Sequence, residues 1–190
     1  KTSELILMTI HRHSNVHHIQ RLKEMKDIIA ELAAHKKVVF PMHPRTKGNL
    51  ERFGLYESVS RLEGVHLTEP QGYLEFLSLM DHAALIVTDS GGIQEESTYL
   101  QVPCLTLREN TERPVTIELG TNQLVKIDAR AVSDTANKIF SGTVKKGEIP
   151  PLWDGQAANR IAAIVAQYLN KNKISKADKS VTEGYGELVS

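Results

Sequence analysis

The sequence predicts an α/β fold, in which a Rossmann-like parallel sheet carries helices on both faces. Short apolar stretches alternate with longer amphipathic stretches along most of the 190 residues. Polar clusters follow most of the apolar stretches, as they do at the ligand-binding edge of an open parallel sheet. A glycine turn at 89–92 separates one apolar stretch from a helical one. This alternation predicts right-handed crossovers between parallel strands.

The predicted strands are short runs of apolar and β-branched residues, which suit strands buried on both faces. Pro103 lies near the start of the fifth strand, where a proline is tolerated at a sheet edge. The strands are expected at 5–10, 37–42, 64–67, 84–88, 102–107 and 123–127.

The predicted helices show apolar residues at spacings of three and four. Asn15, Ser90 and Asp128 are the expected N-caps of three of them. Gly54 weakens the helix that contains it. The helices are expected at 16–34, 49–60, 72–81, 93–99, 115–119, 131–141 and 157–169.

Two of these helices have a well-defined apolar face. In the helix at 72–81, Leu74, Leu77 and Met80 are expected to point inward. The inward residues of the helix at 16–34 are expected to be Ile19, Leu22, Met25, Ile28, Ile29 and Leu32.

The predicted strands and helices place one domain at 1–169 and a polar tail at 170–190. The tail is rich in Lys, Ser and Gly, so we expect it to be poorly ordered or docked on another part of the protein. The chain enters its first strand abruptly after Lys1, which suggests that the native protein continues upstream.

Composition narrows the possible functions. The formal net charge is zero, so no basic field favours nucleic acid. No apolar run approaches the length of a membrane span, and we expect a cytoplasmic protein. The single cysteine, Cys104, lies in an apolar run and is expected to be a core thiol. The spacing of the histidines does not favour a metal site.

The stretch from Leu85 to Glu96 carries the clearest chemistry. A strand, a Gly-Gly turn and a helix N-terminus form a place that accepts an anion, because glycines allow close approach and the N–H groups are free. A carboxylate that follows closely is a good acceptor for ribose hydroxyls. The stretch therefore suggests a nucleotide with its phosphate on Ser90, Gly91 and Gly92. An ordinary capped helix explains the stretch about equally well.

Two further groups suit a phosphate. His11 and Arg12 follow the first strand and pair a titratable ring with a fixed cation, although a solvated turn is the simpler explanation. Arg113 offers a guanidinium fork, and its alternative role is an ion pair with Glu112 or Glu118.

Five motifs occur in this order along the chain: Thr9-Ile10-His11-Arg12, Phe40-Pro41-Met42-His43-Pro44, Asp89-Ser90-Gly91-Gly92-Ile93-Gln94-Glu95-Glu96, Arg108-x-x-Thr111-Glu112-Arg113-Pro114 and Asp154-Gly155-x-Ala157-x-x-Arg160. Together they resemble the non-hydrolysing UDP-N-acetylglucosamine 2-epimerases. The resemblance covers about 5–169 and falls on the C-terminal domain of that family, which is similar in fold to two-domain GT-B glycosyltransferases.

The resemblance implies the UDP-binding half of an enzyme that interconverts UDP-GlcNAc and UDP-ManNAc by eliminating UDP and adding it back. His11 would assist departure of UDP and would be the catalytic residue of this half. Phosphate would contact Ser90, Gly91, Gly92 and Arg113, with Arg12 beside them, and Glu96 would hold the ribose. Arg12 and His43 match positions that contact an effector in bacterial members.

The resemblance also implies what lies outside this chain. The family carries its proton-transferring acids on an N-terminal domain, so the isolated piece is expected to bind UDP or a UDP-N-acetylhexosamine and to be inactive. No cofactor is implied, the parent is expected to be a homodimer, and the pathway would serve cell-surface polysaccharide biosynthesis. Two alternatives stay open: the donor-binding domain of a GT-B glycosyltransferase, and a nucleotide-sugar sensor without turnover.

Overall fold

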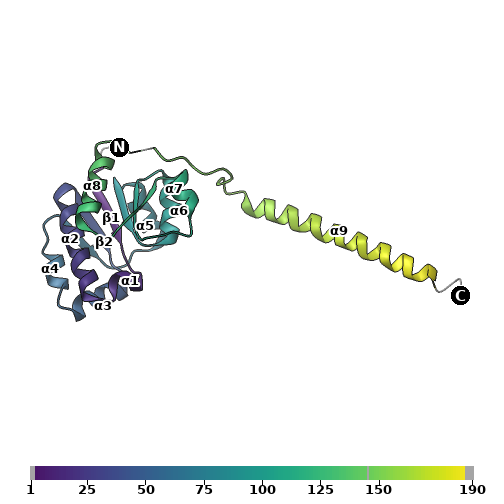
Figure 1. Ribbon diagram of the computed structural model, residues 1–190, viewed down its shortest axis with the longest axis horizontal. Helices are drawn as coiled ribbons and strands as arrows, with labels where there is room; N and C mark the ends of the chain where they lie inside the picture. Colours follow the sequence, from purple (N-terminus) through teal and green to yellow (C-terminus); the bar gives the residue numbers. More distant parts are fainter. Residues whose placement is uncertain (1–2, 145, 187–190) are drawn as a thin grey trace. The chain divides into compact units, whose positions relative to one another are not determined.

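A computed structural model describes residues 3–144 and 146–186, with side chains described up to residue 171. The chain divides into two units, Lys1–Pro150 and Pro151–Ser190. The first unit contains the sheet and the second contains one long helix (Figure 1).

All pairings in the six-stranded sheet are parallel, and the strand order is β3-β2-β1-β4-β5-β6. This confirms the predicted Rossmann-like sheet. From β1 the strand order runs outward to β2 and β3 on one side and to β4, β5 and β6 on the other, so the order reverses between β1 and β4, where Met8 pairs with Val87. Ligands of such sheets bind at this reversal. The strands are β1 Leu5–Thr9, β2 Lys37–Pro41, β3 Val65–Thr68, β4 Leu85–Thr88, β5 Cys104–Leu107 and β6 Asn122–Val125.

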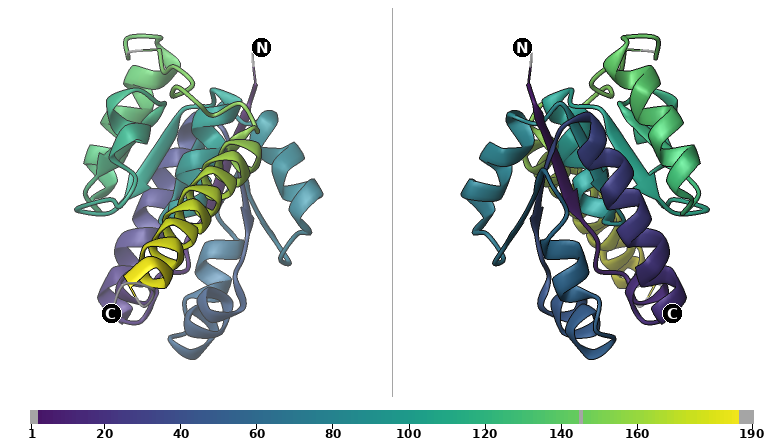
Figure 2. Two further views of the ribbon diagram at one scale, coloured as in Figure 1. Left: turned by 90° about the vertical axis from the view of Figure 1, so that its right-hand side faces the viewer. Right: turned by 90° about the vertical axis from the view of Figure 1, so that its left-hand side faces the viewer.

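The helices of the first unit lie on both faces of the sheet, as predicted (Figures 1 and 2). Asp128 caps α8 by accepting the N–H of Ala131 at 2.8 Å, which confirms that cap. The helices are α1 His13–Val16, α2 Ile19–His35, α3 Pro44–Arg52, α4 Tyr56–Ser60, α5 Tyr73–Asp81, α6 Gly91–Leu100, α7 Pro114–Glu118 and α8 Ala129–Phe140.

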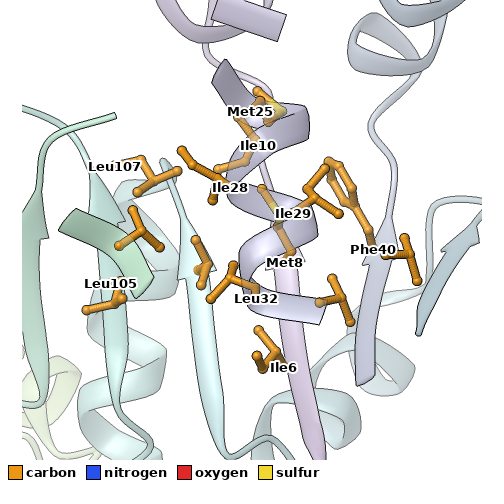
Figure 3. Close-up of a cluster of buried hydrophobic side chains, with 14 of the residues drawn as sticks. Ile6, Met8, Ile10, Met25, Ile28, Ile29, Leu32, Phe40, Leu105 and Leu107 are labelled. Atoms are coloured by element: carbon orange, nitrogen blue, oxygen red, sulfur yellow. The ribbon is translucent and has the colours of Figure 1, made fainter. Parts of the chain in front are cut away.

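One face of the sheet packs against α2, α3, α4 and α8, and α2 and α8 lie side by side (Figure 2). Ile6 and Met8 of β1, and Ile10 just after the strand, belong to the same buried cluster as Ile28 and Ile29 of α2 (Figure 3). Each fully buried side chain of this size contributes about 1.5–3 kcal/mol. This core holds β1 and its polar C-terminal end in a fixed position.

The opposite face packs against α5 and α6. Leu7 and Ile86 meet Met80 of α5 and Ile93 of α6 there. Cys104 belongs to this cluster and is fully buried, which confirms a core thiol; burial raises the pKa of the thiol to about 11.

The helix predicted at 16–34 is found as α2, which begins three residues later at Ile19, and the short helix α1 precedes it at His13–Val16. The prediction that Asn15 caps this helix is wrong. His18 is the N-cap of α2, and the buried Asn15 side chain donates to Asp89 instead. The prediction that Ile19 points inward is also wrong, because this residue lies at the N-terminus of α2 and is 43% exposed.

Two more details differ from prediction. The helix predicted at 49–60 is split into α3 and α4, because Gly54 adopts a φ of +67°, which ends α3. Leu74 of α5 is 73% exposed rather than inward, whereas Met80 is fully buried.

The second unit consists of a turn and α9, Ala157–Gly186. Asp154 pairs with Arg160 and accepts the N–H of Gln156, so the Asp-Gly-x-Ala-x-x-Arg motif fixes the start of α9. These contacts lower the pKa of Asp154 to about 2. The helix predicted at 157–169 extends as α9 to Gly186, into the predicted tail. Residues 187–190 of that tail lie outside the described residues.

Within the described parts of the chain, the model contains no helix with the length and hydropathy that a bilayer crossing demands.

Candidate functional site

The C-terminal ends of five strands bring the predicted polar clusters to one edge of the sheet, as expected for parallel strands. His11 follows β1, His43 follows β2, Glu69 follows β3, Asp89 follows β4 and Arg108 follows β5. The loops after β1, β4 and β5 are further joined by hydrogen bonds, so their functional groups have defined positions.

Asp89 organises the centre of this edge. Its side chain is fully buried, and its carboxylate accepts the backbone N–H of His11 at 3.1 Å and that of Arg12 at 2.9 Å. The amide of Asn15 donates to the same carboxylate at 2.9 Å. The His11 ring completes the set, with Nδ1 3.3 Å from Oδ1. Asp89 therefore fixes the whole turn after β1.

Arg12 is oriented across the edge of the sheet. Its Nε donates to the backbone carbonyl of Asp89 at 2.9 Å, and its Nη2 lies 3.4 Å from Oε1 of Glu112. The guanidinium thus lies between the end of β4 and the loop after β5, where it adds positive charge near the start of α6.

The predicted anion-binding turn forms the N-terminus of α6. Ser90 is the N-cap, as predicted, but its side chain makes no capping bond. The first N–H groups of a helix have no carbonyl partner within the helix, so the N–H groups of Gly91, Gly92 and Ile93 are available to an anion. Neither glycine has a positive φ. A Cβ at Gly92 would meet nothing within 4 Å, so this backbone is open to a ligand.

Glu95 and Glu96 have different environments, although they are adjacent. Glu95 pairs with Arg113, with Oε1 2.9 Å from Nε, although the two groups are not aligned as a hydrogen bond. Glu96 is half-buried. Burial raises the pKa of Glu96, the Glu95 charge adds to this rise, and the Tyr73 hydroxyl opposes it. Of these two acids, Glu95 is thus the one that pairs with an arginine.

The sequence reasoning missed a buried polar network that supports Arg113. The Gln94 side chain is fully buried and accepts from the Thr111 hydroxyl at 2.6 Å and from the Asn122 amide at 3.2 Å. Thr111 in turn accepts the backbone N–H of Arg113 at 2.9 Å. Gln94 also donates to the Ser90 carbonyl at 3.3 Å. The network therefore ties the Arg113 turn to the N-cap of α6.

His43 lies beside His11, with the two rings stacked at a centroid distance of 5.4 Å. Its Nδ1 accepts the N–H of Arg45, and Arg45 donates to the His11 carbonyl at 2.9 Å. Burial lowers the pKa of His43, and electrostatic interaction with the neighbouring His11 and Arg45 lowers it further. The sequence places Arg45 in the polar cluster after β2 but does not reveal its contact with His11, because the two residues are 34 positions apart.

A cavity of about 590 Å³ adjoins Arg12 and Asn15. Arg21, Arg108 and Lys126 also line it, together with the acids Glu109 and Asp128. The basic side chains outnumber the acidic ones, so this part of the edge favours an anion. Among the described residues, no group of three or more histidine, cysteine or acidic side chains is arranged to hold a metal ion.

Comparison with known proteins matches this chain to one family over most of its length. A family model described as UDP-N-acetylglucosamine 2-epimerase matches residues 1–166. The UDP-N-acetylglucosamine 2-epimerase of Methanocaldococcus jannaschii is 41% identical over 168 residues, which cover 85% of this chain and 44% of that protein.

Comparison with solved structures identifies members of the same family. The crystal structure of the Methanocaldococcus jannaschii UDP-GlcNAc 2-epimerase in complex with UDP-GlcNAc and UDP superposes with a TM-score of 0.78 at 38% identity, covering 87% of this chain and 46% of that one. An Escherichia coli heptosyltransferase with ADP has a TM-score of 0.51 at 12% identity, over 77% of this chain and 46% of that one, and shares the fold alone.

The chain spans slightly less than half the length of the relatives that it matches. The match nevertheless extends over most of the described residues, and it includes every strand end that forms the candidate site. The chain therefore belongs to the UDP-N-acetylglucosamine 2-epimerase family.

Proposed function

We propose that this chain is the UDP-binding half of an enzyme that interconverts UDP-GlcNAc and UDP-ManNAc. The observation that carries the proposal is the open N-terminus of α6 at Gly91 and Gly92, with the half-buried Glu96 further along the same helix. It lies where the strand order reverses, next to His11. A family relative binds UDP-GlcNAc and UDP in its crystal structure.

In this proposal the diphosphate lies on the N–H groups of Gly91 and Gly92, with Ser90 beside them. Arg12 and Arg113 supply the flanking positive charge, and a guanidinium can give a phosphate two parallel hydrogen bonds. Glu96 accepts hydrogen bonds from the two ribose hydroxyls. The pairing of Glu95 with Arg113 supports this division, because it leaves Glu96 for the sugar.

The proposed reaction removes a proton from C2 of the sugar while the C1–O bond to UDP breaks. UDP then adds back to C1 of the unsaturated sugar as a proton returns to C2 from the other face. Departure of UDP is aided by groups that stabilise the developing negative charge on the diphosphate. This half supplies those groups through α6, Arg12 and Arg113.

His11 is proposed to donate a proton to the leaving phosphate oxygen. Its Nδ1 faces the Asp89 carboxylate at 3.3 Å, which orients the ring and leaves Nε2 for the ligand. The base at C2 belongs, in this proposal, to the domain that lies outside this chain. The 190-residue chain should therefore bind UDP weakly and leave UDP-GlcNAc unchanged.

Arg12 and His43 are also proposed as contacts for an effector copy of the nucleotide sugar. Arg12 follows His11 directly in the chain, and the His43 ring stacks on the His11 ring, so an effector bound there would reach the group that assists UDP departure. The parent enzyme is proposed to be a homodimer.

Calorimetry with UDP tests the binding half of the proposal. Heat of binding and a rise in melting temperature are expected for the 190-residue chain, and the absence of both at millimolar UDP would contradict it. The full-length parent tests the reaction: incubation with UDP-GlcNAc and no acceptor should give UDP-ManNAc. A parent that only transfers the sugar to an acceptor would instead be a glycosyltransferase, and a parent that binds without turnover would be a sensor.

A further inference from the structure

Glu112 places a carboxylate at the start of α6. Its Oε1 would lie 2.8 Å from a Cβ built on Gly91, so the oxygen is next to the first residue of the helix. The same oxygen lies 3.4 Å from Nη2 of Arg12. The other oxygen, Oε2, lies 2.8 Å from Nη1 of Arg108. One acidic side chain thus bridges two arginines in front of a helix N-terminus.

A phosphate would be attracted by the same groups. Guanidinium groups and helix N–H donors bind carboxylate and phosphate oxygens with similar geometry. The pKa of Glu112 lies below the usual glutamate range, because its own backbone N–H and the Arg108 guanidinium stabilise the charged carboxylate, so it is ionised at neutral pH. Two anions cannot occupy this place together without strong repulsion.

Glu112 is able to leave this position. Its side chain is 45% exposed, and that of Arg12 is 39% exposed, whereas Arg108 is only 11% exposed. The ion pair between Glu112 and Arg12 has both side chains partly exposed, and such pairs are weak, so a diphosphate that carries more charge can replace the carboxylate at Arg12. Arg108 would keep its position because most of its surface is covered.

We propose that Glu112 is a built-in competitor of the nucleotide, a carboxylate that holds Arg12 and Arg108 at the start of α6 and is displaced by the diphosphate. This inference rests on the proposed function, because it concerns the same phosphate site. The competition lowers the affinity for UDP and keeps both arginines in place for the next ligand. It acts on the phosphates and not on the nucleoside.

The test compares UDP and uridine binding to the wild-type chain and to Glu112→Gln, by calorimetry in one buffer. The variant keeps the size of the side chain and removes the charge. Its UDP dissociation constant should fall by about threefold to tenfold, the scale expected when exposed ion pairs no longer compete. Its uridine affinity should not change, because uridine has no phosphate.

Glu31→Gln is the matched control, since it removes one exposed acid on α2, outside the residues of the candidate site. It should leave UDP affinity unchanged, which separates displacement from a general change in charge. Glu112→Ala should act in the same direction as Glu112→Gln.

The outcomes are distinct. If the wild type binds UDP and Glu112→Gln binds it equally well or more weakly, the competitor role is overturned and the proposed function stands. An equal gain in Glu31→Gln also overturns it. Failure of both the wild type and Glu112→Gln to bind UDP overturns the proposed function and the inference with it.

Discussion

The buried carboxylate of Asp89 accepts the backbone N–H of His11 at 3.1 Å, across 78 residues of sequence. The same carboxylate also accepts from Arg12 and from the Asn15 amide. A single acidic side chain at the end of β4 thus sets the conformation of the turn that carries the proposed catalytic histidine. Asp89 is a positioning residue for that turn.

Asp89→Asn should destabilise the fold and disturb this turn. An asparagine has one acceptor oxygen, and its amide group would oppose the N–H donors of His11 and Arg12. We expect the free energy of unfolding to fall by about 2–4 kcal/mol, because buried donors lose a charged acceptor. Urea denaturation measures this change. Asp27→Asn, on an exposed position of α2, is the control and should change stability little.

Local sequence patterns were sufficient to predict the sheet. Apolar runs and the polar residues after them are neighbours in sequence, and parallel pairing then brings the strand ends to one edge. The turn at Ser90 and the capping of α8 by Asp128 were predicted for the same reason, since the Ala131 N–H is only three residues from the cap.

Contacts between distant segments were not predicted. Asn15 has the sequence context of a cap, but its partner is Asp89, 74 residues later. The bond between Gln94 and Thr111 likewise joins segments that no periodicity relates. Leu74 has the correct spacing for an inward residue, yet spacing does not show whether another element covers that position. The roles proposed for His11, Arg12, His43, Ser90, Gly91, Gly92, Glu96 and Arg113 remain predictions.

Gln94→Leu should loosen the Arg113 turn from α6. The substitution removes the acceptor of Thr111 and Asn122 and leaves their buried groups without that partner. We expect a loss of about 1–3 kcal/mol in unfolding free energy. UDP affinity should fall as well, because Arg113 loses its support. Normal stability and normal UDP affinity in this variant would show that the network does not position Arg113.

Glu96→Gln should weaken UDP binding by about tenfold, since a carboxylate accepts two ribose hydroxyls better than an amide does. The effect should be smaller for 2′-deoxy-UDP, which offers one hydroxyl fewer. Calorimetry with both nucleotides measures the difference. Glu31→Gln, on an exposed position of α2, should leave both affinities unchanged. Equal losses in the two variants would rule out ribose binding by Glu96.

The UDP affinity should also depend on pH through Glu96. Burial raises the pKa of this carboxyl above the usual glutamate value. Its neutral form therefore favours the folded state at acidic pH, and that contribution is lost as the pH rises through the raised pKa. Ribose hydroxyls donate to the ionised form, so UDP affinity should fall as the pH is lowered through the same range.

The phosphates of UDP also titrate, so the informative quantity is the ratio of wild-type to Glu96→Gln affinity at each pH. This ratio should shrink toward one on acidification, starting above the ordinary glutamate range. A ratio that does not change with pH would mean that ionised Glu96 does not contact the ligand.

The central claim is that the N-terminus of α6 binds the diphosphate while Glu96 binds the ribose. A crystal structure of this chain with UDP tests it most directly. We predict phosphate oxygens within hydrogen-bonding distance of the N–H groups of Gly91 and Gly92, and both ribose hydroxyls on the Glu96 carboxylate. UDP bound elsewhere on the chain, or bound with its phosphates away from this turn, would contradict the account.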